Sequence, residues 1–159
     1  MGKIISVTNQ KGGVGKTTTA INLAASIALS GKKVLLIDID PQGNASSGLG
    51  VDCDSRGVYE LLMGEATHVE VICSTEIKTL KIIPSRVDLT GAEIELVSRE
   101  ARETILKTAL NGIRDEFEFV VIDCPPSLGL LTLNALAVSA SVLIPMQCEY
   151  YALQGLSHL

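Results

Sequence analysis

The sequence predicts an α/β fold with a mostly parallel, twisted sheet and helices on both faces, which is a three-layer α/β/α arrangement. Apolar runs of four to five residues alternate with longer stretches of helical periodicity, as is typical of parallel strands joined by crossover helices. The 159 residues are 47% apolar and 19% charged, with a net charge of −5. This composition fits one well-packed domain and excludes both intrinsic disorder and a basic nucleic-acid-binding domain.

The first third of the chain predicts two strands and the helix between them. Residues 4–8 form an apolar run that leads into a glycine-rich stretch. Residues 17–30 carry apolar side chains at spacings of three to four, and Gly31 follows as a C-terminal cap. The second strand is expected over residues 34–37. Pro, Gly, Asn and Ser residues then predict a long loop over residues 40–56, with room for one helical turn.

The remaining elements follow from the same alternation of patterns. Residues 90–115 carry a helical pattern whose inward face consists of Leu106, Ala109, Leu110 and Ile113. A last helix is expected to begin near Ala152. The other expected elements are a helix over residues 58–63, strands over 80–84 and 119–122, a helix over 130–138 and a strand over 142–144.

The end of the chain carries few charges and could suggest a membrane segment. From residue 119 onward only Asp123 and Glu149 are charged, and residues 124–148 form an uncharged run of 25, which is long enough to span a bilayer. Three prolines and several polar residues interrupt this run, so we expect a buried loop, helix and strand instead. There is no signal-like N-terminal segment and no C-x-x-C pair among the four cysteines, so we expect a reducing, cytoplasmic location and no membrane partner.

A glycine-rich stretch, Asn-Gln-Lys-Gly-Gly-Val-Gly-Lys-Thr-Thr at residues 9–18, lies between the first strand and the first helix, which is the context of a P-loop. The strict pattern G-x-x-x-x-G-K-[ST] departs at its first position, Gln10. The glycines let backbone N–H groups face phosphate oxygens, and the helix N-terminus adds positive potential. We expect Lys16 on the β and γ phosphates and the Thr17 hydroxyl on Mg²⁺. The expected phosphate-binding residues are Lys11, Gly12, Gly13, Val14, Gly15, Lys16, Thr17 and Thr18.

Three carboxylates follow predicted strands and should meet at the same edge of the sheet as this loop. Asp123 ends an apolar strand, where a Walker B aspartate would hold Mg²⁺ through a water. Asp38 and Asp40 end the second strand, and Asp38 is a further candidate for metal contact. Alternatively, Asp38 and Asp40 only cap the loop, because Asp before Pro is ordinary turn chemistry. Lys11 is not needed by a nucleotide that already has Lys16, so it is expected to serve a neighbouring site in trans.

In combination, these motifs resemble the ParA/Soj/MinD family of deviant Walker A ATPases, and most of all its partitioning branch. Residues 11–18 resemble the deviant Walker A motif, and Asp-Ile-Asp-Pro-Gln-Gly-Asn at residues 38–44 resembles the second acidic motif. Asp-Cys-Pro-Pro-Ser at residues 123–127 resembles the Walker B and switch segment. Residues 84–96 and 147–153 are also similar to the partitioning branch, Soj in particular, so the resemblance covers essentially all 159 residues.

The resemblance implies a P-loop NTPase fold and an ATPase that forms a nucleotide-sandwich dimer when ATP is bound. Lys11 would reach the partner's phosphates, Asp40 would orient the attacking water, and Lys16 would neutralise phosphate charge, which makes Lys11, Lys16 and Asp40 the expected catalytic residues. Thr17 and Asp123 would place Mg²⁺. Members of this branch bind DNA without sequence preference in the ATP state and release it when a ParB-like partner stimulates hydrolysis, so the full-length family is nucleoid-associated.

The chain departs from the family in its length. We expect residues 1–159 to be a single P-loop ATPase domain, the N-terminal part of a longer family fold that continues with adenine contacts, dimer surface and DNA-binding residues. With no Lys or Arg after Arg114, this chain is expected to bind DNA weakly or not at all. Two alternatives stay open. One is a MinD-like membrane-associated positioning ATPase, and the other is a form that keeps the fold but has lost turnover.

Overall fold

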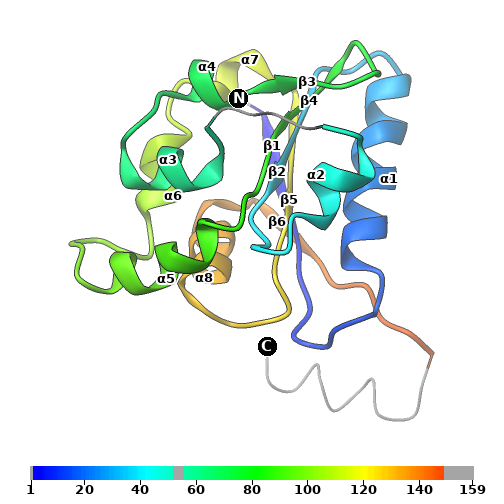
Figure 1. Cartoon of the computed structure of the whole chain (residues 1–159). Helices are drawn as coiled ribbons and strands as arrows, with labels where there is room; N and C mark the ends of the chain where they lie inside the picture. Colours follow the sequence, from blue (N-terminus) through cyan, green and yellow to red (C-terminus); the bar gives the residue numbers. More distant parts are fainter. Residues whose placement is uncertain (1, 52–55, 149–159) are drawn as a thin grey trace.

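The structure is a computed structural model that describes residues 2–51 and 56–148. In this part of the chain, six strands form one sheet in the order β3-β4-β2-β5-β1-β6 (Figure 1). Strand β1 pairs with β5 and β6, and β2 pairs with β4 and β5, all in parallel, while β3 runs antiparallel to β4. The expected mostly parallel sheet is confirmed. The strands are β1 (Lys3–Val7), β2 (Val34–Asp38), β3 (Cys73–Ser74), β4 (Leu80–Ile83), β5 (Phe119–Asp123) and β6 (Ser141–Leu143).

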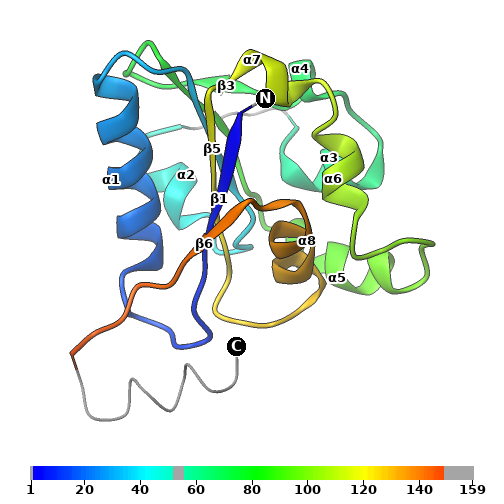
Figure 2. The ribbon, with the colours of Figure 1, turned by 180° about the vertical axis from the view of Figure 1, so that it is seen from behind.

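Helices cover both faces of the sheet and complete the three layers. Helices α1 and α2 lie on one face, and α3, α5, α6 and α8 lie on the other, as the two opposite views show (Figures 1 and 2). The described helices are α1 (Lys16–Leu29), α2 (Asn44–Gly48), α3 (Val58–Met63), α4 (His68–Val71), α5 (Leu89–Val97), α6 (Ile105–Ala109), α7 (Ile113–Glu116) and α8 (Leu130–Val138).

The core is divided between the two faces because successive strand residues point to opposite sides. In β2, which is buried along its whole length, Leu36 belongs to the cluster under α1, whereas Leu35 and Ile37 belong to the cluster under the other helices. The small side chains of Ala20 and Ala24 are fully buried, so they allow α1 to pack closely on the sheet. A strand buried on both faces needs a continuous apolar sequence, which explains the unbroken apolar runs.

Most predicted elements lie within one or two residues of their expected bounds. The expected helices 58–63 and 130–138 match α3 and α8, and α2 is the single helical turn expected in the loop over residues 40–56. Strand β5 is buried as expected, with Val120, Val121 and Ile122 fully inaccessible, but the expected buried strand over residues 142–144 is wrong, because β6 lies at the edge of the sheet and Val142 is 46% exposed. None of the described helices combines the length and apolarity needed to cross a bilayer. The helix expected from Ala152 lies outside the described residues.

The expectation of one continuous helical pattern over residues 90–115 is wrong. The structure contains three shorter helices here, α5, α6 and α7. The backbone takes positive φ at Ala101 (52°) and at Gly112 (94°), which a right-handed helix does not allow. The inward face was nevertheless correct, since Leu106, Leu110 and Ile113 are fully buried and Ala109 is partly buried.

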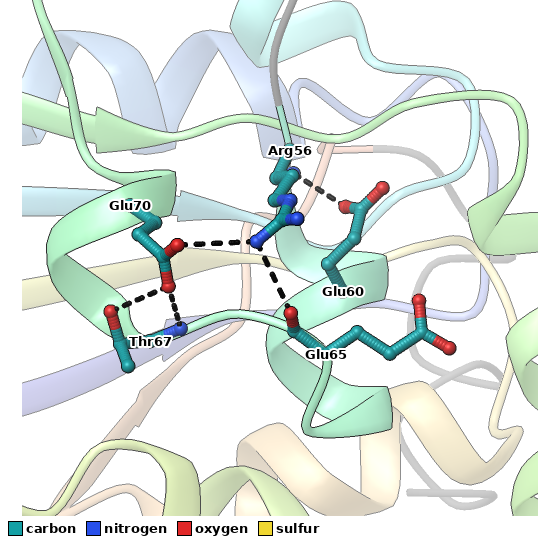
Figure 3. A network of polar contacts seen from close by, with 6 residues as sticks. Arg56, Glu60, Glu65, Thr67 and Glu70 are labelled. Atoms are coloured by element: carbon teal, nitrogen blue, oxygen red, sulfur yellow. Dashed lines mark hydrogen bonds and ion pairs between the residues drawn. The ribbon is translucent and has the colours of Figure 1, made fainter.

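Helix α4 and the edge strand β3 lie between α3 and β4, and the sequence pattern predicted neither of them. Figure 3 shows Arg56 extending toward α4, where its guanidinium donates to the Glu65 carbonyl at 3.3 Å and pairs with Glu70 at 3.2 Å. The backbone and hydroxyl of Thr67 donate to the same Glu70 carboxylate, so they lower its pKa, as Arg56 also does. These contacts hold α3 and α4 together at the surface.

The cysteines differ in state. Cys73 is disulfide-bonded, which the absence of a C-x-x-C pair did not predict, whereas Cys124 and Cys148 are free. Burial raises the pKa of the Cys124 thiol to about 12, so this thiol is neutral at physiological pH and unsuited to nucleophilic or metal chemistry.

Candidate functional site

The glycine-rich loop connects the end of β1 to the start of α1 and forms a phosphate-sized cradle. Gly13 and Gly15 have φ angles of 74° and 88°, a left-handed backbone that favours glycine. Helix α1 begins at Lys16 directly after Gly15, so the free N–H groups of its first turn lie at the loop. A helix N-terminus that follows a glycine-rich curl is a ready-made anion site.

Lys16 is held inside this loop with only 7% of its surface exposed. Its ammonium donates to the Lys11 carbonyl at 3.1 Å. Burial lowers the pKa of Lys16, and the Asp123 and Asp40 carboxylates oppose that shift. A phosphate bound in the loop would stabilise the charged ammonium further, because burial penalises an ammonium whose charge is incompletely compensated.

Asp123 ends β5 in the middle of the sheet and is fully buried. It lies in register with Val7 of β1 and with Asp38 of β2, so it is placed between the glycine-rich loop and the second acidic motif. Neither carboxylate oxygen has a hydrogen-bond partner of standard geometry among the described residues. Burial, together with Asp38 and Asp40, raises the pKa of Asp123 to about 7, although the Thr17 hydroxyl is near enough to oppose the shift.

The second acidic motif has a different arrangement, because Asp38 is fully hydrogen-bonded. One Asp38 oxygen accepts the Asp40 amide at 3.2 Å, and the other accepts both the amide and the hydroxyl of Ser46 at 2.8 Å. Burial raises the pKa of Asp38, while its bonds to Ser46 and Asp40 lower it. These bonds occupy both oxygens, whereas Asp40 uses one oxygen to accept the Gln42 amide at 3.0 Å.

A cavity of about 470 Å³ joins the loop to the second acidic motif. It brings together most of the predicted site residues, with Asp123 buried beneath them and Asp38 buried behind Asp40. Lys11 and Val14 do not line it: Lys11 is exposed outside the cavity and Val14 is buried. The lining residues are Gly12, Gly13, Gly15, Lys16, Thr17, Thr18, Asp40, Gln42, Asn44 and Pro126.

Sequence reasoning assigned no role to several residues of this site. Gln42, Asn44 and Pro126 line the cavity, and each belongs to a motif that carried the family resemblance, so the sequence contained a signal for them.

The glycine-rich loop is also hydrogen-bonded to the segment after β6. The Asn9 amide donates to the Pro145 carbonyl at 2.9 Å, and the Gln147 amide donates to the Gly13 carbonyl at 3.1 Å. No local pattern predicts such long-range ties.

The donor set at the base of the cavity fits a Mg²⁺ ion. Mg²⁺ prefers oxygen ligands and usually binds one or two protein groups, water and phosphate oxygens. The unpaired carboxylate oxygens of Asp123 and the Thr17 hydroxyl are such ligands. No group of three or more His, Cys, Asp or Glu side chains among the described residues could hold a metal alone. The glycine-rich loop, the buried Lys16 and the aspartates at the ends of β2 and β5 together define a P-loop nucleotide-binding protein.

Comparison with known proteins gives the family. The model of the AAA_31 family, described as an AAA domain, matches residues 2–159. The sporulation initiation inhibitor protein Soj of Bacillus subtilis is 56% identical over 100% of this chain and 64% of its own length. The chromosome-partitioning ATPase Soj of Treponema pallidum is 55% identical over 100% of this chain and 62% of its own length.

Two solved structures have closely similar folds. A Mycobacterium smegmatis protein named cobyrinic acid a,c-diamide synthase, solved with ADP and magnesium, is 42% identical with a TM-score of 0.94, over 99% of this chain and 65% of that one. A putative plasmid partition protein of Borrelia burgdorferi, bound to AMPPNP, is 34% identical with a TM-score of 0.90, over 99% of this chain and 66% of that one.

The chain therefore belongs to the AAA_31 family, and its Soj relatives confirm the resemblance to the ParA and Soj partition ATPases. It spans 62–64% of the length of these two relatives.

Proposed function

We propose that the chain carries the catalytic core of a ParA-like ATPase, which binds and hydrolyses ATP with Mg²⁺ during chromosome or plasmid partitioning. The observation that supports this most is the cavity in which Lys16, Thr17 and Asp40 meet above the buried, unpaired Asp123. The names of the relatives and the nucleotides bound in the similar structures support ATP as the substrate.

The phosphates of ATP would lie on the glycine-rich loop, where Lys16 neutralises the charge that develops as the γ-phosphoryl group leaves. Thr17 would hold Mg²⁺ directly and Asp123 would hold it through a water, and the bound ion supplies further neutralisation of phosphate charge. Asp40 lines the cavity and would orient the attacking water with the oxygen that Gln42 does not occupy. In this arrangement we assign Asp38 to holding the backbone at Asp40, because both of its oxygens accept hydrogen bonds.

We infer the partners from the family relationship. We propose that ATP binding brings two copies together as a sandwich dimer, with Lys11 of each copy reaching the other's phosphates. The exposure of Lys11 outside its own cavity agrees with this role. A ParB-like protein would stimulate hydrolysis. Measuring ATP hydrolysis with and without double-stranded DNA and a ParB-type N-terminal peptide distinguishes this function from the MinD-like alternative and from a fold without turnover.

Two substitutions separate nucleotide binding from hydrolysis. Lys16→Ala should abolish ATP binding, because its buried ammonium lines the cavity in which the phosphates would lie. Asp40→Ala should leave binding intact and lower hydrolysis by about 100-fold, because the water loses its orientation. Calorimetry with the ATP analogue AMPPNP and a phosphate-release assay with ATP measure the two effects. The exposed Lys107→Ala and Asp115→Ala are matched controls. Hydrolysis at the parent rate by Asp40→Ala would show that the water-orienting assignment is wrong.

A further inference from the structure

The serine at position 46 joins the second acidic motif to a different part of the fold. Ser46 lies in α2 with only 5% of its surface exposed. Its hydroxyl donates to Asp38 at 2.8 Å and accepts the amide of Ser85 at 3.0 Å. Ser85 lies between β4 and α5, so one hydroxyl links the end of β2 and helix α2 to a segment 39 residues further along the chain.

The hydrogen bonds of Ser46 form a bridge that continues from Asp38 to the cavity lined by Lys16, Thr17 and Asp40, called here the nucleotide cavity. The Asp38 oxygen that Ser46 does not contact accepts the amide of Asp40. A buried carboxylate held from both sides has a fixed orientation, because any rotation would leave a buried donor unpaired. Ser46 therefore fixes Asp38, and Asp38 fixes the backbone that carries the Asp40 side chain into the cavity.

A second cavity lies on the other side of this bridge. It measures about 390 Å³ and lies between residues 41–51 and residues 84–88, and Gln42 lines both it and the nucleotide cavity. Ser46 and Ser85 are part of its wall. The Ser85 hydroxyl is buried without a hydrogen-bond partner among the described residues, so Ser85 is held here by its backbone and not by its side chain.

We propose that Ser46 is a positioning residue for ATP hydrolysis, which acts through Asp38 to hold Asp40 toward the attacking water. This inference rests on the proposed function, in which Asp40 orients that water. Ser46 does not line the nucleotide cavity. Its hydroxyl therefore affects the rate of hydrolysis and does not bind the nucleotide.

The neighbouring serine provides a matched control. Ser47 is exposed on the same helix, and no hydrogen bond joins its hydroxyl to the described residues. In the full chain, Ser46→Ala should lower kcat for ATP hydrolysis by about 10- to 100-fold, the loss expected when a catalytic group is displaced. The KM for ATP and the affinity for ADP should stay near the parent values, while the Tm should fall by a few degrees, because the buried Ser85 amide loses its acceptor. Ser46→Thr retains the hydroxyl and should restore most of the rate, while Ser47→Ala should have the parent rate.

Amide hydrogen exchange tests the bridge without relying on turnover. The Asp40 amide should exchange about tenfold faster in Ser46→Ala than in the parent or in Ser47→Ala, because its acceptor Asp38 keeps the amide of residue 46 but loses the hydroxyl that also holds it. Unchanged exchange and a parent-like kcat in Ser46→Ala would overturn the inference, as would equal losses in Ser46→Ala and Ser47→Ala. If Asp40→Ala hydrolyses ATP at the parent rate, the proposed role of Asp40 fails instead, and the exchange data alone decide whether Ser46 positions it.

Discussion

Asp123 combines full burial with two carboxylate oxygens that have no well-formed hydrogen bond from the described part of the chain, a costly state for a charged group. Its pKa of about 7, compared with 3.8 for an unperturbed carboxyl, means that the folded protein without nucleotide binds a proton here that the unfolded chain releases. Between these two values the folded state holds more protons, so the free energy of unfolding falls as the pH rises. Above about pH 7 this contribution becomes constant.

Replacement of Asp123 by Asn tests this electrostatic cost. Between pH 5 and pH 8 the parent should lose about 2–3 kcal/mol more unfolding free energy than Asp123→Asn, because the amide cannot ionise. Urea unfolding with EDTA and without nucleotide measures the difference. Identical pH slopes for the parent and Asp123→Asn would contradict the predicted proton uptake. At this scale the sequence was informative, since Asp123 was identified by its place after an apolar strand, but its lack of hydrogen-bond partners depends on what folds around it.

Among the elements, α8, the start of α6 and the segment between α5 and α6 are joined by one buried amide. Asn134 in α8 donates to the carbonyl of Arg102 at 2.7 Å and to that of Leu130 at 2.8 Å, and it accepts the amide of Leu106 at 3.0 Å. It therefore satisfies backbone groups that are free because the predicted helix over residues 90–115 is interrupted. The interruption is stabilised from a different helix, which explains why the local pattern did not reveal it.

Asn134→Ala should lower the free energy of unfolding by about 2–4 kcal/mol, because buried backbone groups of the interruption lose their partners. Denaturant unfolding measures the loss. Asn22→Ala is the matched control: Asn22 is exposed and bonds one carbonyl within its own helix, so its replacement should be neutral or slightly stabilising. Equal effects of the two substitutions would mean that Asn134 does not stabilise the interruption.

Elements with a continuous local signal were predicted well, and those fixed by distant contacts were not. Apolar runs and periodicity predict strand β5 and helix α8, and the sequence motif predicts the glycine-rich loop. The short strand β3 consists of two residues that form a strand because β4 lies beside them. Likewise, Gln42 was quoted within a motif, but only the fold shows that it separates two cavities.

The charge distribution of the whole molecule leads to a prediction about DNA. The chain has a net charge of −5 and no Lys or Arg after Arg114. Non-specific DNA affinity depends on neutralising phosphates with basic side chains, so residues 1–159 should bind DNA weakly or not at all. A filter-binding titration with double-stranded DNA at low salt measures this affinity. Tight binding that weakens steeply with added salt would contradict the prediction.

The order of the strands also determines when the site can exist during synthesis. Strand β1 carries the glycine-rich loop and β2 carries the second acidic motif, yet the two strands do not pair with each other, because β5 lies between them. The loop and Asp40 are therefore made early but cannot be brought together until residues 119–123 leave the ribosome. Pairings over such sequence separations form slowly. A nascent chain consequently exposes unpaired edges of β1 and β2 until residues 119–123 have emerged, and its nucleotide site cannot form before that point.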